Sequence, residues 1–349
     1  MRFYNTNHNY YCGVDLHSKS MYLCILDSAG EVVLHKNIPC DPEKFLLEIA
    51  PFRENLVVGC ECTYSWYWLA DICLKEGIEF VLGHALYMKA IHGGKSKNDR
   101  IDSDKIARLL RGGMFPMAYV YPEEMRATRD LLRRRLFFVQ KRSELMAHVQ
   151  MTHHQYNRVS PPKSLVYKAN REEFPLEFKD PSTNRMLESD LKMIEHYSEE
   201  IRKLEWFISK TAHLDGDNAL LLSLLKTVPG IGDVLSLTIL YEIQDVSRFP
   251  TQQHFCSYAR LVKPEKTSAG KTTGGGGRKI GNHQLKWALS EATVLMLAKS
   301  EVAKKYLKRL MKKGSKAKAL STMSHRLGKA IYFMLLRRQA FDPNFFFAH

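Results

Sequence analysis

Two short apolar runs near the start of the chain each end in one acidic residue, and this pattern constrains the fold more than any other feature. The first run reads Tyr11-Cys12-Gly13-Val14-Asp15, and the second runs from Leu56 to Glu61. A continuous apolar run of this length, bounded by turn signals, is typical of a strand that is buried in the middle of a sheet. We therefore expect two such strands, each with a carboxylate where it ends.

Other elements are predicted around these two strands. Residues 21–26, 31–35 and 78–82 have strand composition, and Asp27-Ser28-Ala29-Gly30 is a turn signal. Helices are expected after Asp41-Pro42, over 66–75 and over 98–111. Three strands followed by alternating helix and strand indicate an α/β domain over residues 1–122, with a mixed sheet and an antiparallel hairpin at its edge.

A second pair of acidic residues stands at the start of the predicted helix 98–111. Asp99 and Asp102 share a helical face, because three residues are nearly one turn. Together with Asp15 and Glu61 they can converge at one end of the sheet. Carboxylate oxygens of this kind bind Mg²⁺, which stabilises the attacking and leaving oxygens in phosphodiester chemistry. Each acid alone could simply cap a strand or a helix, but the four together favour a metal site.

The charge balance indicates a polyanionic partner. The chain has 52 Lys+Arg against 37 Asp+Glu, for a formal net charge of +15. Such a basic protein is expected to bind nucleic acid. The seven cysteines contain no C-x-x-C pair, which argues against zinc and favours reduced thiols in a cytoplasmic protein, at the nucleoid if the source is bacterial. No segment approaches the roughly 18 apolar residues that cross a bilayer, so no membrane partner is expected.

The middle region, residues 123–215, has helical periodicity. Leu132, Leu136, Val139, Met146 and Val149 follow a spacing of three to four residues, and a heptad-like spacing follows from Leu187 to Ile208. The pattern predicts either an antiparallel coiled-coil arm or two amphipathic helices of a compact bundle.

The last region, residues 216–349, is predicted to be mostly helical. Pro229-Gly230-Ile231-Gly232 lies between two predicted helices and resembles a helix-hairpin-helix turn, in which Gly230 and Gly232 would let backbone N–H groups approach a phosphate. The alternative is a tight turn without a ligand. A basic, Gly-rich loop follows at 261–282. Its Ser268 could attack a phosphate, although a merely flexible basic loop is the simpler interpretation of the residues alone.

Several basic residues are candidates for contacts with nucleic acid. The stretch 301–338 is strongly basic with interleaved apolar residues, which predicts an amphipathic helix against a phosphate backbone, or else a solvated face. The candidates in the whole chain are Lys97, Arg100, Arg133, Arg134, Lys271, Arg278, Lys279, Lys304, Lys305, Lys308, Arg309 and Lys312.

These segments together resemble the DEDD-type transposases of bacterial insertion sequences, a family that includes the pilin-gene invertases. The matching segments are Gly13–Lys19, Cys60-Glu61-Cys62-Thr63, Lys97–Asp102, Val228–Gly232, Arg248-Phe249, Thr267–Lys271 and Lys279–Asn282. Ala269 departs from the family pattern, in which Gly commonly follows the serine, and this leaves Thr267 as an alternative to Ser268.

The resemblance implies a RuvC-like, RNase H-type first domain, a coiled-coil arm and a serine-bearing helical domain. It also implies Mg²⁺-dependent recombination of double-stranded donor and target DNA, with Ser268 linked covalently to a DNA phosphate. A structured guide RNA and a homo-oligomer, from dimer to tetramer, are further implications. The alternatives are a site-specific invertase of the same family, a RuvC-like endonuclease or junction resolvase, and a non-catalytic nucleic-acid-binding protein.

Overall fold

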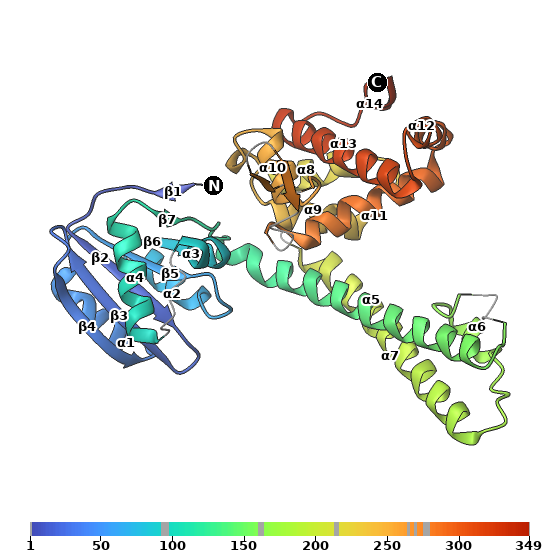
Figure 1. Ribbon diagram of the computed structural model, residues 1–349, viewed down its shortest axis with the longest axis horizontal. Helices are drawn as coiled ribbons and strands as arrows, with labels where there is room; N and C mark the ends of the chain where they lie inside the picture. Colours follow the sequence, from blue (N-terminus) through green and yellow to red (C-terminus); the bar gives the residue numbers. More distant parts are fainter. Residues whose placement is uncertain are drawn as a thin grey trace. The chain divides into compact units, whose positions relative to one another are not determined.

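The chain forms two compact units, Met1–Glu123 and Glu124–His349 (Figure 1). The computed structural model describes residues 2–91, 98–159, 164–212, 216–263, 266–268, 271–274 and 280–348, without the side chains of 89–91, 266–268 and 272–274. Among the described residues, no helix is both long and apolar enough to cross a membrane. The seven cysteines are free thiols, and only Cys62 is exposed.

The first unit is built on a five-stranded mixed sheet with the strand order β4-β3-β2-β5-β6. Strands β4, β3 and β2 are antiparallel, whereas β2, β5 and β6 are parallel. This confirms the predicted mixed sheet with a hairpin edge, including all five expected strands. Their bounds are Tyr10–Leu16 (β2), Ser20–Asp27 (β3), Val32–Pro39 (β4), Leu56–Glu61 (β5) and Glu79–Gly83 (β6).

The two faces of this sheet are covered by different helices. Successive side chains of a strand point to opposite faces. Cys12 and Val14 of β2 pack with residues of α1 and α2 in one buried cluster. Tyr11 and Gly13 lie on the other face, which α4 covers (Figure 1). These helices are Pro42–Ile49 (α1), Tyr67–Lys75 (α2) and Asp99–Arg111 (α4).

All three helices were predicted, and their ends have local causes. Asp41 caps α1 by accepting a hydrogen bond from the Lys44 N–H, and Asn98 caps α4 by accepting one from the Ile101 N–H. Gly77 follows α2 with a φ of +67°, a conformation that favours glycine. Short elements without a clear sequence signal complete the unit, namely β1 (Phe3–Tyr4), η1 (Ala50–Phe52), α3 (Ala85–Ile91) and β7 (Phe115–Pro116).

Helix α4 lies directly on the two central strands because both carry a glycine there. A Cβ atom on Gly13 would lie 2.2 Å from the Ser103 carbonyl oxygen and 2.4 Å from the Ala107 nitrogen. A Cβ on Gly59 would lie 2.7 Å from a methyl group of Leu110. The glycines therefore allow the helix backbone to approach β2 more closely than any other residue type would.

The second unit begins with two long helices, α5 (Glu123–Gln155) and α7 (Pro181–Thr211), which lie side by side (Figure 1). Arg135 donates hydrogen bonds to Glu205, and the Phe138 and Tyr197 rings lie 5.5 Å apart. The buried apolar residues of α7 recur every seven positions, at Leu187, Ile194, Ile201 and Ile208. At the far end, Leu165 and Phe178 pack with Val149 of α5 and with Leu187 and Ile194 of α7. The short helix α6 spans Lys168–Glu172.

The remaining helices form one hydrophobic core, which also includes Met125 and Leu132 of α5 and Ile208 of α7. The expected mostly helical C-terminal region is thus confirmed. Its elements are α8 (Gly216–Lys226), α9 (Asp233–Ile243), η2 (Val246–Arg248), α10 (Gln252–Tyr258), β8 (Lys266–Ser268), β9 (Lys271–Gly274), α11 (His283–Lys299), α12 (Glu301–Met311), α13 (Lys316–Arg337) and α14 (Pro343–Ala348).

A buried carboxylate joins three of these helices. The Glu242 side chain on α9 is 2% exposed and accepts hydrogen bonds from Arg129 and Arg133 of α5 and from the amide of Asn282. Asn282 in turn caps α11 by accepting a hydrogen bond from the Leu285 N–H. Burial alone would raise the pKa of Glu242, but the hydrogen bond from Arg133 and the two guanidinium charges outweigh it and hold the pKa below its usual value.

The turn between α8 and α9 packs closely against α11. Gly230 has a φ of +96°, and a Cβ there would lie 2.6 Å from the Met296 nitrogen of α11. A glycine is therefore needed at position 230 so that the turn can pack against α11. Gly232, in contrast, has open space where a Cβ would point.

Replacing Gly13 with alanine should destabilise the first unit. The added methyl group meets the backbone of α4, which cannot move aside as a side chain can, so we expect a loss of about 1–3 kcal/mol in the free energy of unfolding. Chemical denaturation measures it. Gly216→Ala is the matched control, because nothing lies within 4 Å of its Cβ position. Equal stability of the two variants would contradict the close approach of α4.

Replacing Glu242 with glutamine should destabilise the second unit by about 3–5 kcal/mol at neutral pH, because the buried Arg129 guanidinium and the partly exposed Arg133 guanidinium lose their counter-charge. The pKa of Glu242 is lowered in the folded state. Its stabilisation is therefore complete above the unfolded-state pKa and is lost as the pH falls through the lower, folded-state pKa. The wild-type and variant proteins should converge in that acid range. Glu301→Gln, which removes an exposed pair with Lys304, should change stability by less than about 1 kcal/mol.

Candidate active site

Asp15 and Glu61 lie on the face of the sheet that α4 covers. In the register of β2 with β5, Tyr11 pairs with Val57 and Gly13 with Gly59, and the last registered pair is Val14 with Cys60. One residue further on, each strand reaches its acidic residue. Because side chains alternate along a strand, Asp15 and Glu61 both point to the side of Gly13 and Gly59. The two strand ends therefore present neighbouring carboxylates on one face.

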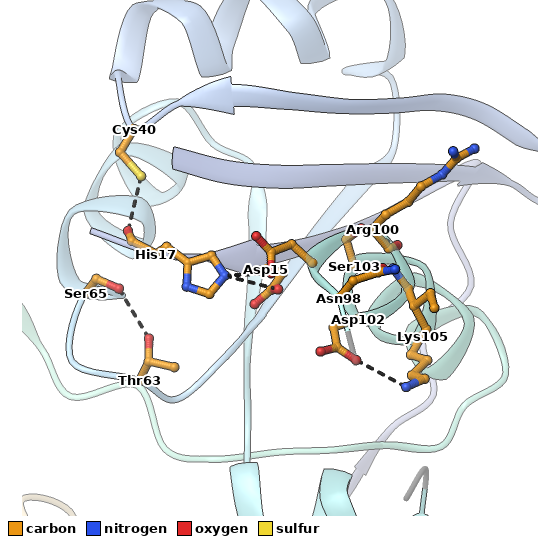
Figure 2. A network of polar contacts seen from close by, with 12 residues as sticks. Asp15, His17, Cys40, Thr63, Ser65, Asn98, Arg100, Asp102, Ser103 and Lys105 are labelled. Atoms are coloured by element: carbon orange, nitrogen blue, oxygen red, sulfur yellow. Dashed lines mark hydrogen bonds and ion pairs between the residues drawn. The ribbon is translucent and has the colours of Figure 1, made fainter. Parts of the chain in front are cut away.

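The N-terminal end of α4 brings Asp99 to the same place. Its Oδ1 lies 3.4 Å from Nε2 of His17, and the same nitrogen lies 3.3 Å from Oδ2 of Asp15. The Asp15 side chain is 15% exposed, whereas those of His17 and Asp99 are about half exposed. Figure 2 shows the His17 ring directed at Asp15. Within the described part of the chain, these three are the one group of histidine, cysteine or acidic residues spaced to hold a metal ion, with ligand atoms within 4.8 Å of one another.

The N-cap residue of α4 is Asn98, so the alternative that Asp99 caps this helix is excluded. Acidic side chains in the first turn also interact favourably with the positive end of the helix dipole.

Asp102 and Glu61 are not part of this group. Asp102 accepts a hydrogen bond of 3.1 Å from Lys105, and its charge acts on Asp15 (Figure 2). Glu61 is half-buried and pairs with Gly83 in the sheet. Of the four predicted acids, Asp15 and Asp99 thus belong to the group that is spaced to hold a metal ion, whereas Asp102 and Glu61 do not.

Burial and like charge make the Asp15 carboxylate costly to ionise. Burial raises the pKa of Asp15, the charges of Asp99 and Asp102 raise it further, and His17 partly offsets them. A carboxylate in this setting is stabilised by a nearby cation. The donor set, with carboxylates from two elements and an accessible side, is suited to a hard divalent ion.

His17 had no role in the interpretation of the sequence. It lies directly after β2, two residues beyond Asp15, and its N–H donates to the Ser20 carbonyl in the hairpin. The sequence feature that could have identified His17 as a site residue was its position two residues after a strand-end aspartate. That feature is weak evidence, because the approach of His17 to Asp99 depends on how α4 lies on the sheet.

Ser268 belongs to the strand pair β8–β9, in which it is registered with Lys271. The side chain of Ser268 lies outside the described residues, as do residues 264–265, 269–270 and 275–279. The base of this segment is well held. The Asn282 N–H donates to the Tyr258 carbonyl at 2.6 Å, and Arg260 Nε donates to the Gly281 carbonyl at 2.9 Å.

The candidate phosphate-binding residues lie in several places. Arg100 is exposed beside the acidic group, and Lys271 is exposed on β9. Arg133 is paired with Glu242, so the structure gives it a partner inside the protein. Lys97, Arg278 and Lys279 lie outside the described residues.

Helix α12 confirms the predicted amphipathic pattern. Ala303, Tyr306 and Leu307 are buried. Arg309 also donates to the Phe347 carbonyl. All of the candidate basic residues on and after this helix are exposed, namely Lys304, Lys305, Lys308, Arg309 and Lys312, and Arg134 on α5 is exposed as well.

Comparison with known proteins gives consistent matches along the chain. A DEDD transposase model of the IS110 group matches residues 12–157, and a model described as the transposase IS116/IS110/IS902 family matches residues 222–308. The chain is similar to the transposase for insertion sequence element IS1111A of Coxiella burnetii, with 21% identity over 94% of this chain and 90% of that protein. It is also similar to the putative transposase y4qE of Sinorhizobium fredii, with 25% identity over 82% of this chain and 70% of that protein. The chain therefore belongs to the DEDD-type insertion-sequence transposases.

Proposed function

We propose that this protein is a transposase that cuts and rejoins double-stranded DNA with a divalent cation held by Asp15, Glu61, Asp99 and Asp102. The observation that carries the proposal is the approach of Asp15 and Asp99, from two different elements, to one histidine nitrogen at the end of β2. The family membership and the net charge of +15 support DNA as the substrate.

Mg²⁺ is the cation we propose for this site. The two strand-end acids would hold it from the sheet, and the two α4 acids would hold it from the helix. When bound, such an ion supplies charge stabilisation to the attacking and leaving oxygens of a phosphodiester. The protein itself would contribute by holding the carboxylates in fixed positions. The close contact of α4 with β2 at Gly13 would set the distance between the two pairs of carboxylates.

We further propose that Ser268 is the nucleophile of the strand-breaking step. Its hydroxyl oxygen would form a bond to phosphorus, and the bond from phosphorus to a deoxyribose oxygen would break, with the proton passing to that leaving oxygen. Rejoining reverses these changes. Basic residues close to the serine in sequence, such as Lys271, Arg278 and Lys279, would stabilise the charge that develops on the phosphate. Thr267 is the alternative nucleophile.

The remaining implications of the resemblance are proposed on the same basis. The functional division would be a RuvC-like domain (1–122), a coiled-coil arm (123–215) and a serine-bearing domain (216–349), with which the mixed sheet, the paired long helices and the helical core are compatible. A structured guide RNA would choose donor and target DNA. Subunits would assemble as dimers or tetramers on DNA, at the nucleoid in the cytoplasm. The exposed basic residues around α12 would contact phosphates, together with Lys97, Arg100, Arg133, Arg134, Gly230 and Gly232.

Asp15→Asn should abolish both the response to Mg²⁺ and DNA cleavage. With Mg²⁺ at ten times its Kd, the wild-type protein should gain about 1.4 kcal/mol in stability. The variant should gain nothing, because it lacks the largely buried carboxylate of Asp15. Cleavage should fall about 100-fold or more. Thermal unfolding with and without Mg²⁺ measures the first effect, and nicking of DNA that carries the element ends measures the second.

The control for this experiment is Asp104→Asn. Asp104 lies on the same helix but pairs with Arg108, so the variant should keep the wild-type response. A metal response and cleavage activity that both survive in Asp15→Asn would remove Asp15 from the proposed site.

Ser268→Ala should prevent formation of a covalent protein–DNA adduct that survives denaturing electrophoresis, whereas Thr267→Ala should still form it. The opposite pattern would identify Thr267 as the nucleophile. Cleavage that depends on Asp15 but never gives an adduct would instead favour a hydrolytic RuvC-like endonuclease. DNA binding without cleavage, unchanged when all four acids are neutralised, would favour a non-catalytic protein.

A further inference from the structure

The imidazole of His17 lies between the two acidic elements of the proposed metal site. Its Nε2 is within 3.4 Å of a carboxylate oxygen from each, namely Oδ2 of Asp15 on β2 and Oδ1 of Asp99 on α4. No other described histidine, cysteine or acidic residue joins this group. His17 therefore occupies a central position in the cluster rather than its periphery.

The spacing of the three atoms suits ligands of one ion. Two donor atoms that each lie about 2.1 Å from a metal are separated by about 3.0 Å at a right angle and about 3.4 Å at a tetrahedral angle. The separations of 3.3 Å and 3.4 Å from Nε2 to the two carboxylate oxygens fall at the upper end of this range. The ligand atoms of the three residues all lie within 4.8 Å of one another.

The backbone of His17 is held on both sides, so the side chain starts from a defined position. The His17 N–H donates to the Ser20 carbonyl at 3.0 Å, and the His17 carbonyl accepts a hydrogen bond from the Cys40 thiol at 3.2 Å (Figure 2). The preceding residue, Leu16, is still registered with Met21 in the β2–β3 hairpin. A ligand carried on a rigid hairpin in this way keeps its geometry better than one on a free loop.

A nitrogen donor changes which ion the site favours. Mg²⁺ is a hard cation that takes oxygen ligands and retains water, whereas imidazole suits first-row transition metals. Mn²⁺ accepts carboxylates as readily as Mg²⁺ does and also accepts an imidazole nitrogen. We propose that His17 is an additional protein ligand, beside the acidic residues, of the cation at Asp15 and Asp99, and that it makes this site prefer Mn²⁺ to Mg²⁺. This inference rests on the proposed metal site.

The test compares the two metals on the full-length protein. Electron paramagnetic resonance of free Mn²⁺ gives its affinity, and competition with Mg²⁺ gives the preference. We expect Mn²⁺ to bind at least about ten-fold more tightly than Mg²⁺ to the wild-type protein. In His17→Gln, the Mn²⁺ affinity should fall about ten-fold or more, while the Mg²⁺ affinity should change less than about three-fold. Electron spin-echo measurements should detect an imidazole nitrogen on the bound Mn²⁺ of the wild type and none in the variant.

The matched control is His148→Gln. His148 also pairs with an aspartate, Asp190, at 2.6 Å, but it lies on α5 in the other unit. It should leave the Mn²⁺ affinity and the nitrogen signal unchanged.

The outcomes separate this inference from the function on which it rests. Binding of Mn²⁺ that is lost in Asp15→Asn but carries no nitrogen signal, or equal affinity for Mn²⁺ and Mg²⁺, would overturn the role of His17 and leave the acidic site intact. In that case His17 would only hydrogen-bond to the carboxylates. Absence of any Asp15-dependent binding of either metal would overturn both proposals.

Discussion

The contact of α4 with the backbone of β2 is the constraint on which the proposed site depends. Gly13 allows the Ser103 carbonyl and the Ala107 nitrogen to approach the strand to distances that a Cβ atom would forbid. Gly59 does the same for the Leu110 side chain on β5. Without this approach, Asp99 would lie too far from His17 and Asp15 to act with them. Asp15 of the sheet and Asp99 of the helix are thus brought together by the absence of two side chains.

The second unit depends on a different kind of interaction. Its helices are joined by a carboxylate, Glu242, that is almost completely buried and receives hydrogen bonds from Arg129, Arg133 and Asn282. Such a site is costly to leave half-satisfied, since each lost partner leaves a buried charge or donor. Because Asn282 also caps α11 and lies at the base of the segment that carries Ser268, the network fixes where that segment leaves the helical core.

The sequence predicted those features of the fold that depend on local hydrophobic periodicity and on capping and turn residues. The five strands, the starts of α1 and α4, and the end of α2 follow from apolar runs, capping residues and glycine. It did not predict features that depend on packing between distant residues. The ion pair of Arg133 with Glu242 and the packing of Gly230 against α11 are two such features. His17 was missed because its neighbour Asp99 is distant in sequence. Family resemblance, rather than spacing, singled out Ser268.

The central claim, that Asp15 and Asp99 hold a divalent cation, can be tested most directly in crystals grown or soaked with Mn²⁺. Anomalous scattering identifies Mn²⁺ without reference to activity. We expect a peak about 2.0–2.4 Å from carboxylate oxygens of both Asp15 and Asp99. A clear Mn²⁺ peak elsewhere in the protein, with none between these two side chains, would contradict the account.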